Sequence, residues 1–341
     1  MALVHGGRLR QAASGSGIAL EQWLDLSTGI SPWAYPITTL PETCWQRLPE
    51  DDDGLIPVAR RWAGAAEAAG CVAVAGSQAA IEALPRLRLT GHVAVVAPGY
   101  AEHAWCWEKA GHQVHRLSAA DMDAALRCSQ PLIDVVVWLQ PNNPTGEYLP
   151  IETLQRWRHQ LAARGGWLVV DEAFVDACRA PSLIAHCDEP GLLLMRSVGK
   201  FFGLAGIRGG FVFAERALCE VLSDFLGPWS VSGPARALMK RALADIAWQE
   251  RQRARIERAS LQLQAVLEQS GLDASMGTDL FRFVPCADAI SLHHHLLRQG
   301  ILVRLFEQPL ALRFGLPGGS QQLQRLADAL ATWNGDATRS R

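Results

Sequence analysis

One lysine of the sequence lies in a glycine-rich turn between two short apolar segments. Lys200 follows residues 192–195 and precedes residues 211–214, and we expect both segments to be buried strands. Apolar surroundings favour the neutral form of a lysine, and a neutral amine can form a Schiff base with an aldehyde. Ser197 and Arg208 flank it, and a hydroxyl and a guanidinium are good phosphate ligands. The combination points to pyridoxal phosphate, although a solvated lysine beside a helix-capping arginine would give the same short pattern.

A second stretch suited to phosphate lies far from Lys200 in the sequence. Gly76, Ser77 and Gln78 follow an expected strand at residues 71–75 and begin a helix. The first N–H groups of a helix have no partner within it and carry the positive end of its dipole. We therefore expect an anion site at this turn.

Three further loops carry polar or aromatic groups where expected strands end. Tyr100, Asn143 and Asp171 follow the apolar segments 92–97, 133–139 and 167–170, respectively. Ligands of parallel sheets gather at the carboxyl ends of the strands. A carboxylate placed there is poorly solvated unless it is paired, and a protonated pyridine nitrogen is a suitable partner. Asp171 could instead cap a helix.

The elements that must position these residues alternate between strand and helix. This rhythm predicts an α/β fold, with a mostly parallel sheet covered on both faces. We expect strands at 71–75, 92–97, 114–117, 133–139, 167–170, 192–195 and 211–214, and helices at 56–69, 102–110, 120–128 and 151–163, besides the one at residue 77.

After residue 216 this alternation of strands and helices stops. A helical region at 234–269 is expected to lead to a smaller α+β part with strands at 280–284, 301–305 and 310–314, a helix at 287–298 and a final helix that ends at about residue 333. The predicted organisation is an N-terminal arm (1–45) packing on the active site and the small domain, a large cofactor-binding domain (46–230) and a small C-terminal domain (231–341).

Residues of the arm and of the small domain could bind an anionic ligand. Arg304 and Arg313 occupy two expected strands, from which both guanidinium groups could reach one anion. His5 and Gly6 near the start, and the turn around Gly29, could close over a ligand. An arm that fastens a dimer is an equally good interpretation of these N-terminal residues.

Composition and charge exclude several classes of function. Charged residues make up 19% of the chain and the net charge is −2, which gives no electrostatic case for nucleic acid as a partner. The arginines of residues 251–258 are expected to be a solvated helix face. No apolar stretch suits a signal peptide or a membrane helix, and eight cysteines without a C-x-x-C pair indicate free thiols in the cytoplasm. The histidines 293–295 point in different directions on a helix, so no metal site is expected.

The candidate cofactor residues, in their order and spacing, resemble the cofactor set of fold-type I pyridoxal-phosphate enzymes. They are Gly76, Ser77, Gln78, Tyr100, Asn143, Asp171, Ser197, Lys200 and Arg208, and the likeness extends over residues 5–330. The resemblance implies that Lys200 binds the cofactor covalently and carries a proton, and that Asp171 pairs with the pyridine nitrogen. It implies contacts of Asn143 with the ring hydroxyl and of Tyr100 with the ring face. The phosphate would be held by Ser77, Gln78, Ser197 and Arg208, beside Gly76. The substrate carboxylate would bind Arg313 and the backbone near Gly29, and a substrate phosphate would bind His5, beside Gly6, and Arg304.

Within this family the sequence is similar to the histidinol-phosphate aminotransferase branch, and inside it to the threonine-phosphate decarboxylases of cobalamin synthesis. The features behind this are residues 5–7, 25–32 and 171–176. Aminotransferases of the branch usually carry tyrosine at the position of Phe174. Related enzymes also often have a tyrosine where this chain has Leu48, and it reaches the cofactor phosphate of a partner subunit. The resemblance implies a homodimer acting on L-threonine O-3-phosphate. An aminotransferase is the alternative, and a sensor without catalysis is a weaker one.

Overall fold

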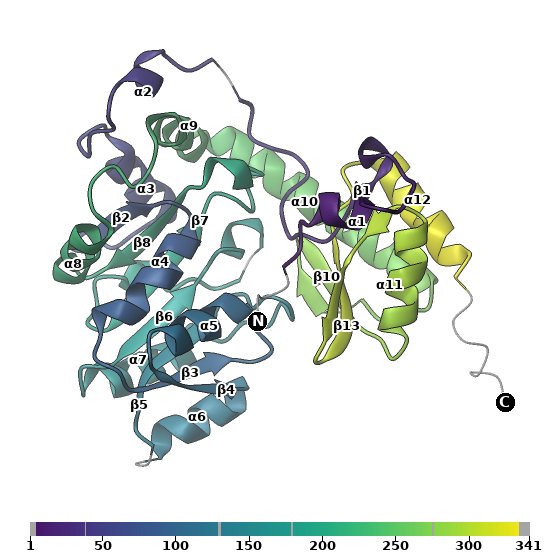
Figure 1. The fold of residues 1–341 in the computed structure, drawn as a ribbon. Helices are drawn as coiled ribbons and strands as arrows, with labels where there is room; N and C mark the ends of the chain where they lie inside the picture. Colours follow the sequence, from purple (N-terminus) through teal and green to yellow (C-terminus); the bar gives the residue numbers. More distant parts are fainter. Residues whose placement is uncertain (1–4, 38, 129–130, 179, 275, 334–341) are drawn as a thin grey trace. The chain divides into compact units, whose positions relative to one another are not determined.

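The computed structural model describes residues 5–37, 39–128, 131–178, 180–274 and 276–333 (Figure 1). Their contacts divide the chain into two units. The large unit contains the described residues of Ala34–Asn143 and Glu147–Glu250. The small unit contains those of Met1–Trp33, Pro144–Gly146 and Arg251–Arg341, so it joins the first and last parts of the sequence.

A seven-stranded sheet forms the centre of the large unit, in the order β2-β8-β7-β6-β5-β3-β4. The strands β7, β6, β5, β3 and β4 run parallel, and β8 is antiparallel to both of its neighbours. This confirms the predicted α/β class with a mostly parallel sheet. The strands are β2 (Gly70–Val74), β3 (His92–Val96), β4 (Gln113–Leu117), β5 (Ile133–Leu139), β6 (Trp167–Asp171), β7 (Leu192–Ser197) and β8 (Gly210–Ala214).

Helices cover both faces of this sheet. Alternate residues of a strand point to opposite faces, and Val135 and Val137 belong to a core cluster with residues of α4, α5 and α8. Trp138, on the other face, contacts Trp157 of α7, with 5.9 Å between ring centroids. The helices of this unit are α2 (Thr43–Gln46), α3 (Leu55–Ala63), α4 (Ser77–Ala83), α5 (Ala101–Lys109), α6 (Ala119–Arg127), α7 (Ile151–Ala162), α8 (Arg216–Leu226) and α9 (Gly233–Ala244), with the 3-10 turns η2 (Leu84–Leu87), η3 (Val175–Ala177), η4 (Ile184–His186) and η5 (Ala205–Ile207).

The small unit combines an antiparallel sheet with helices. Its four-stranded sheet has the order β12-β13-β10-β9. A separate parallel pair joins β1 to β11, with Leu24 opposite Ile301, so the N-terminal segment is hydrogen-bonded into this unit. Its elements are α1 (Leu9–Ala13), η1 (Leu20–Gln22), β1 (Leu24–Asp25), β9 (Met276–Thr278), β10 (Phe281–Pro285), α11 (Ala289–Arg298), β11 (Ile301–Leu302), β12 (Arg304–Glu307), β13 (Leu310–Gly315) and α12 (Ser320–Ala331); α10 (Ile246–Gln269) begins in the large unit and continues in the small one.

Most predicted bounds lie within two residues of the observed ones, but three elements differ further. The helix expected at 56–69 ends at Ala63, because Gly64 adopts a left-handed conformation whose N–H bonds the carbonyls of the last turn. The helical region 234–269 is two helices, and the side chain of Asp245 between them accepts the N–H of Trp248. The strand expected at 301–305 divides into β11 and β12.

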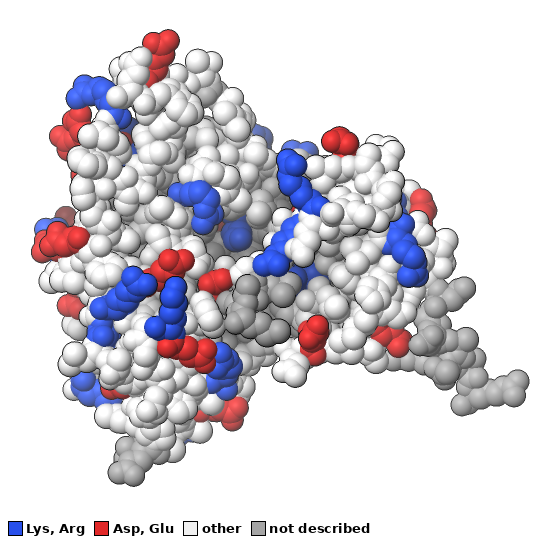
Figure 2. Space-filling view, viewed as in Figure 1, with Lys and Arg blue, Asp and Glu red and all other residues white. Residues whose placement is uncertain are grey.

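The large unit extends beyond the expected range of 46–230 at both ends. The backbone N–H of Tyr35 donates to the carbonyl of Phe202, and α9 packs on α3. Residues of Pro144–Gly146 group with the small unit. No helix among the described residues is long and apolar enough to cross a membrane. On the face in Figure 2, positive and negative side chains are interspersed over the large unit.

Candidate active site

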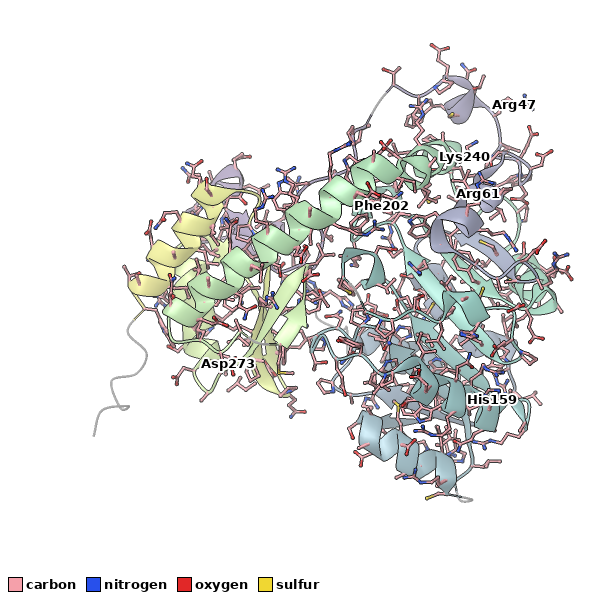
Figure 3. All side chains as sticks on the ribbon, turned by 180° about the vertical axis from the view of Figure 1, so that it is seen from behind. Arg47, Arg61, His159, Phe202, Lys240 and Asp273 are labelled. Carbon is pink, nitrogen blue, oxygen red and sulfur yellow. The ribbon has the colours of Figure 1, made fainter. Side chains whose placement is uncertain are left out.

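Lys200 lies in the turn that follows β7 in the large unit. Its Nζ is 5.6 Å from the ring centroid of Phe174, which follows β6. The next two residues, Phe201 and Phe202, are fully buried, and Phe202 stacks on Trp248 at an interplanar angle of 9° (Figure 3). The turn is thus anchored by aromatic packing on one side, while the amine lies beside an apolar ring. A ring face this close attracts an ammonium group, so Phe174 helps to hold the Lys200 side chain in place.

Residues predicted to hold phosphate converge next to this turn. A Cβ atom on Gly76 would lie 2.7 Å from a guanidinium nitrogen of Arg208, so the arginine packs directly on the glycine backbone. A Cβ atom on Gly210 would lie 3.0 Å from the backbone nitrogen of Ser77. Gly76 itself has a φ of 76°, which a residue with a side chain rarely adopts. Because these backbones approach one another closely, backbone N–H groups, hydroxyls and the Arg208 guanidinium surround a common point.

The remaining two predicted phosphate ligands have defined partners. The Ser197 hydroxyl accepts the N–H of Gly199 at 3.2 Å, which orients it within the turn. The Gln78 side chain donates to Glu82 and Glu102 and accepts the Tyr100 hydroxyl at 3.4 Å. Because both the nitrogen and the oxygen of its side-chain amide have these partners, Gln78 would bind a phosphate through its backbone N–H.

Asp171 ends β6 and is 6% exposed. One of its oxygens accepts the N–H of Ala173 at 3.0 Å, and the other lies 3.0 Å from Nε2 of His103. His103 is 1% exposed on α5 and contacts Tyr100 edge to face, with 6.1 Å between ring centroids. The imidazole of His103 orients the Asp171 carboxylate, which can accept a further hydrogen bond. The Tyr100 ring lies next to this imidazole. Burial, and then Glu102 and Asp171, raises the pKa of Tyr100 to about 12.

The loop that carries Asn143 is fixed by hydrogen bonds within the large unit. The preceding residue, Asn142, donates its side-chain amide to the carbonyl of Pro98 at 2.8 Å. Gln140 accepts from Trp138 and from the backbone of Leu149. The link to Pro98 joins the loop after β5 to the loop that leads to Tyr100, so Asn143 and Tyr100 come from tied loops.

A cavity of about 980 Å³ in the small unit contains three of the predicted substrate ligands. His5, Gly6 and Arg304 line it, together with Arg8 and residues of α11 and β12. A Cβ atom on Gly6 would lie 2.3 Å from the carbonyl oxygen of Ser27, so only glycine fits there. Burial, and then the charge of Arg8, lowers the pKa of Arg304. Cationic groups that gather at a cavity form a suitable site for an anion.

Arg313 stands beside this group on β13. It lies directly opposite Arg304 across the β12–β13 pair and donates to the carbonyl of Ser27 at 2.8 Å. Gly29 is buried two residues further along the same segment. Burial, and then Arg304, lowers the pKa of Arg313 to about 10. Like charges opposite each other on a sheet repel, and a shared anion would relieve that repulsion.

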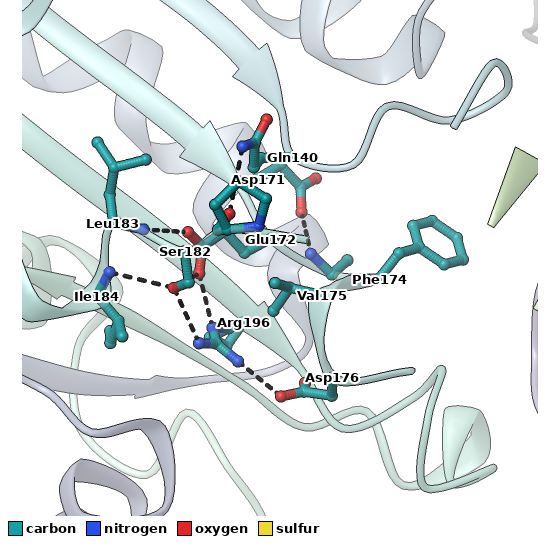
Figure 4. Close-up of polar contacts among 12 residues, drawn as sticks. Gln140, Asp171, Glu172, Phe174, Val175, Asp176, Ser182, Leu183, Ile184 and Arg196 are labelled. Carbon is teal, nitrogen blue, oxygen red and sulfur yellow. Dashed lines mark hydrogen bonds and ion pairs between the residues drawn. The ribbon is translucent and has the colours of Figure 1, made fainter. Parts of the chain in front are cut away.

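The structure shows contacts in and next to the site that the sequence analysis did not indicate. His103 is the partner of Asp171, and its spacing of three residues from Tyr100 on a helix was a signal that both face the same way. Arg8 belongs to the cavity with His5. Glu172, Arg196 and Asp176 form a buried ion-pair network at the ends of β6 and β7 (Figure 4). No sequence pattern indicated this network, because it depends on which strands are neighbours.

The nine residues predicted to bind the cofactor all belong to the large unit, and they fit a phosphorylated pyridine. Arg208 and the glycine-lined backbone at Ser77 provide donors for a phosphate. The buried Asp171, oriented by His103, provides an acceptor for a ring N–H. Lys200 provides the amine. These three kinds of group are those that pyridoxal phosphate requires.

Comparison with known proteins places the chain in a family. Residues 61–330 match the family of aminotransferases of class I and II. A threonine-phosphate decarboxylase of Pseudomonas aeruginosa is 46% identical over 96% of this chain and 97% of its own length. Another, of a Sinorhizobium species, is 42% identical over 96% of this chain and 98% of its own.

Solved structures agree on the fold. The L-threonine-O-3-phosphate decarboxylase of Porphyromonas gingivalis superposes with a TM-score of 0.75 over 91% of this chain and 98% of its own, at 18% identity. The histidinol-phosphate aminotransferase of Sinorhizobium meliloti, solved with pyridoxal 5'-phosphate, gives a TM-score of 0.79 at 20% identity, over 96% of this chain and 94% of its own. The chain therefore belongs to the aminotransferase class I and II family, in its group of threonine-phosphate decarboxylases, whose cofactor is pyridoxal phosphate.

Proposed function

We propose that this protein decarboxylates L-threonine O-3-phosphate to (R)-1-amino-2-propanol O-2-phosphate in cobalamin biosynthesis. The observation that carries the proposal is the 46% identity, over nearly the whole of both chains, to a protein named as a threonine-phosphate decarboxylase. The cluster of arginines and His5 in the small unit supports a substrate with two anionic groups. We place the enzyme in the cytoplasm as a homodimer.

We assign the cofactor to the large unit. Ser77, Ser197, Arg208 and the backbone of Gly76 and Gln78 would hold its phosphate, Asp171 its ring nitrogen, Asn143 its ring hydroxyl, and Tyr100 its ring face. Lys200 would bind it covalently until substrate arrives. When bound, pyridoxal phosphate supplies an electron-accepting ring that takes up the electron pair left when the carboxylate departs as CO2.

The chain's own residues decide which bond of the substrate breaks. The bond from Cα to the carboxylate carbon breaks, and a proton must then be added to Cα. We assign this proton to the Lys200 amine, which is released once substrate has taken its place. The assignments for substrate are Arg313 and the backbone near Gly29 for the carboxylate, and His5 and Arg304, beside Gly6, for the phosphate. Orientation of the bond by these anion contacts is the source of specificity.

Amino-group transfer is the second candidate, because the residues that bind the cofactor suit both reactions. One observation bears on the choice: Lys200 lies beside the ring of Phe174, which has no hydroxyl to assist proton movement at this point. Phe174→Tyr should therefore increase amino transfer to a 2-oxo acid as a side reaction. Formation of the amino acid product, measured in both proteins, checks this, and equal rates would make Phe174 a packing residue only.

The proposed function is tested by incubating the holoenzyme with L-threonine O-3-phosphate, with and without a 2-oxo acid, while following CO2 release and amino transfer. CO2 release without an acceptor is the expected result. Transfer that requires the acceptor, with no CO2, would make the protein an aminotransferase. Unphosphorylated L-threonine is the matched control, because it lacks the group assigned to His5 and Arg304, and it should react far more slowly.

A further inference from the structure

A buried network of charges links the ends of the two strands that lead into the candidate active site (Figure 4). Glu172 is fully buried, and its Oε2 accepts from Nε of Arg196 at 2.9 Å. Nη1 of Arg196 donates to Asp176 at 2.6 Å. The second oxygen of Glu172 accepts the backbone N–H of Leu183 at 2.9 Å, and Ser182 donates to the first. We call Glu172, Arg196 and Asp176 the buried triad.

Glu172 and Arg196 of the buried triad point to the face of the sheet opposite to that of Asp171 and Ser197. Val169 and Met195 face the core cluster that includes α4 and α5, so Asp171 and Ser197, two positions further along each strand, face the same way. His103 on α5 bonds Asp171 on that face. Glu172 and Arg196, each one residue away, point to the other face, where Trp62 of α3 lies under the guanidinium, 5.4 Å from Cζ to the ring centroid. Phe174 also points away from the triad in Figure 4.

Each member of the ion pair is a chain neighbour of a cofactor residue. Glu172 follows Asp171, and Arg196 precedes Ser197. Asp171 is paired with Met195 across the two strands, and the N–H of Glu172 donates to the Met195 carbonyl at 2.9 Å. The side-chain ion pair therefore continues the strand pairing one step beyond the end of β6. A displacement of the Glu172–Arg196 ion pair would therefore move the ends of β6 and β7, which carry Asp171 and Ser197.

The triad also connects to the turn of Lys200. The ring of Trp62 contacts Phe202, with 5.9 Å between centroids, and Phe202 is two residues after the lysine. Trp62 contacts Phe211 of β8 as well, at 6.2 Å. One packed chain of groups thus runs from Glu172 through Arg196 and Trp62 to the turn that carries the reactive amine.

We propose that the buried triad is a positioning unit that sets the placement of Asp171, Ser197 and the Lys200 turn relative to one another. A buried ion pair adds little net stability compared with apolar packing, whereas its directional hydrogen bonds fix geometry. Arginine suits this task because its planar fork bonds two carboxylates and a hydroxyl in fixed directions. The inference rests on the cofactor roles proposed for Asp171 and Ser197, and not on the identity of the substrate.

The test compares charge-removing variants at the triad with a matched control at the other end of β7. Glu172→Gln, Asp176→Asn and Arg196→Gln each remove one charge of the triad. Arg158→Gln is the control, because Arg158 is equally buried and pairs with Glu189 at 2.8 Å, just before β7 begins. For each protein, the dissociation constant of pyridoxal phosphate, the pH at which the bound cofactor changes its absorbance, and the thermal unfolding of the apoprotein are measured.

We expect Glu172→Gln and Arg196→Gln to weaken cofactor binding by about tenfold and to shift the pH of the absorbance change, while Arg158→Gln lowers thermal stability without either effect. The double variant Glu172→Gln/Arg196→Gln should show less than the sum of the two single effects. Loss of thermal stability with an unchanged dissociation constant and absorbance transition would overturn the proposal and leave the triad a purely structural ion pair. If Arg196→Gln does not fold, Glu172→Gln and Asp176→Asn decide by the same readouts. Failure of the proposed reaction would appear separately, as absence of CO2 release by the unchanged protein.

Discussion

The residue at the centre of the proposed chemistry is Lys200, which has aromatic residues beside its amine and directly after it in the chain. Its amine lies beside the Phe174 ring, and the two residues that follow it are buried. Arg208, in the same turn, adopts a left-handed conformation with a φ of 52°. A residue other than glycine adopts this conformation at a cost in free energy. Here the conformation directs the Arg208 guanidinium to the backbone of Gly76.

Lys200→Ala should abolish turnover and leave the cofactor bound without a covalent link. The amine is the one group assigned both to covalent binding and to proton return, whereas the phosphate contacts do not depend on it. Borohydride reduction followed by mass measurement checks the covalent link, and CO2 release checks the turnover. A variant that keeps normal turnover would contradict the role of this lysine.

Tyr100 should keep its proton to unusually high pH. Burial, with Glu102 and Asp171 next, raises its pKa to about 12 in the folded protein, whereas a tyrosine of the unfolded chain ionises near pH ~10. The folded state therefore holds more protons between these values, and the contribution of Tyr100 to stability falls as the pH rises from about 10 to about 12. Alkaline titration of tyrosinate absorbance should show a late step that disappears in Tyr100→Phe. A difference between the two proteins at pH 10 instead of 12 would refute this.

At the scale of elements, α9 is joined to the loop before α3 by a buried arginine. Arg236 donates to both oxygens of Asp53 at 2.9 and 3.1 Å, and Lys240 of the same helix donates to the Asp53 carbonyl at 2.8 Å (Figure 3). Burial of Asp53 opposes ionisation, but the bonds and charge of Arg236 outweigh it, so the pKa of the carboxyl is lowered. This ion pair helps to explain why the large unit continues through α9.

Asp53→Asn should lower the free energy of unfolding by about 2 kcal/mol at neutral pH. Because the folded pKa is depressed, the stabilisation is present above the ordinary value near ~4 and is lost as the pH falls through the folded value. Chemical denaturation at several pH values checks both the size and the pH dependence. Asp51→Asn is the control, since the Asp51 side chain is 96% exposed and 3.5 Å from Arg236, and it should have little effect. Equal effects of the two substitutions would contradict the assignment.

Elements whose apolar residues are continuous could be predicted from the sequence almost to the residue. The strand at 133–139 has the predicted bounds, because six of its seven positions are buried on one face or the other. The helix at 56–69 was predicted too long, because the alanine-rich residues after Gly64 were given more weight than the stop signal of this glycine. The bonds of Arg60 to the carbonyls of Ala66 and Glu67 could not be predicted from local sequence. Side-chain bonds of this kind depend on the folded chain.

The same limit applies to the candidate site. Lys200, Asp171 and the turn at Gly76 stand next to apolar strands, so local sequence was enough to single them out. Arg196 looks in the sequence like an ordinary end of a strand, and its partners come from 20 and 24 residues away. Only the order of strands in the sheet brings those groups together.

For the molecule as a whole, we expect association through an exposed apolar region of the large unit. Trp45, Leu48 and Trp229 are 71, 62 and 58% exposed. Pro49, next to Leu48, lines a cavity of about 760 Å³ together with Trp229. Exposed apolar side chains mark a contact surface where they form a continuous patch, and we expect these three to belong to the contact of the proposed homodimer.

Light scattering should give the wild-type protein twice the 37.1 kDa mass of one chain. Trp45→Ser combined with Leu48→Ser should shift the mass toward that of one chain as the protein is diluted, because it removes apolar area from the contact. Leu89→Ser is the control, since Leu89 is 94% exposed in the loop before β3, whereas the cavity is lined by residues of β2 at the far edge of the sheet. A wild-type mass of 37.1 kDa would contradict the dimer.

The pairing of Leu24 with Ile301 determines the order in which the chain can fold as it is synthesised. Residues 34–250 have left the ribosome before any residue of β11, β12 or β13 has been made, so the large unit can form early. The strand β1 is translated long before β11, with which it pairs. The strand β1 therefore lacks its partner while residues 26–300 are being made, and the small unit is completed after the large one.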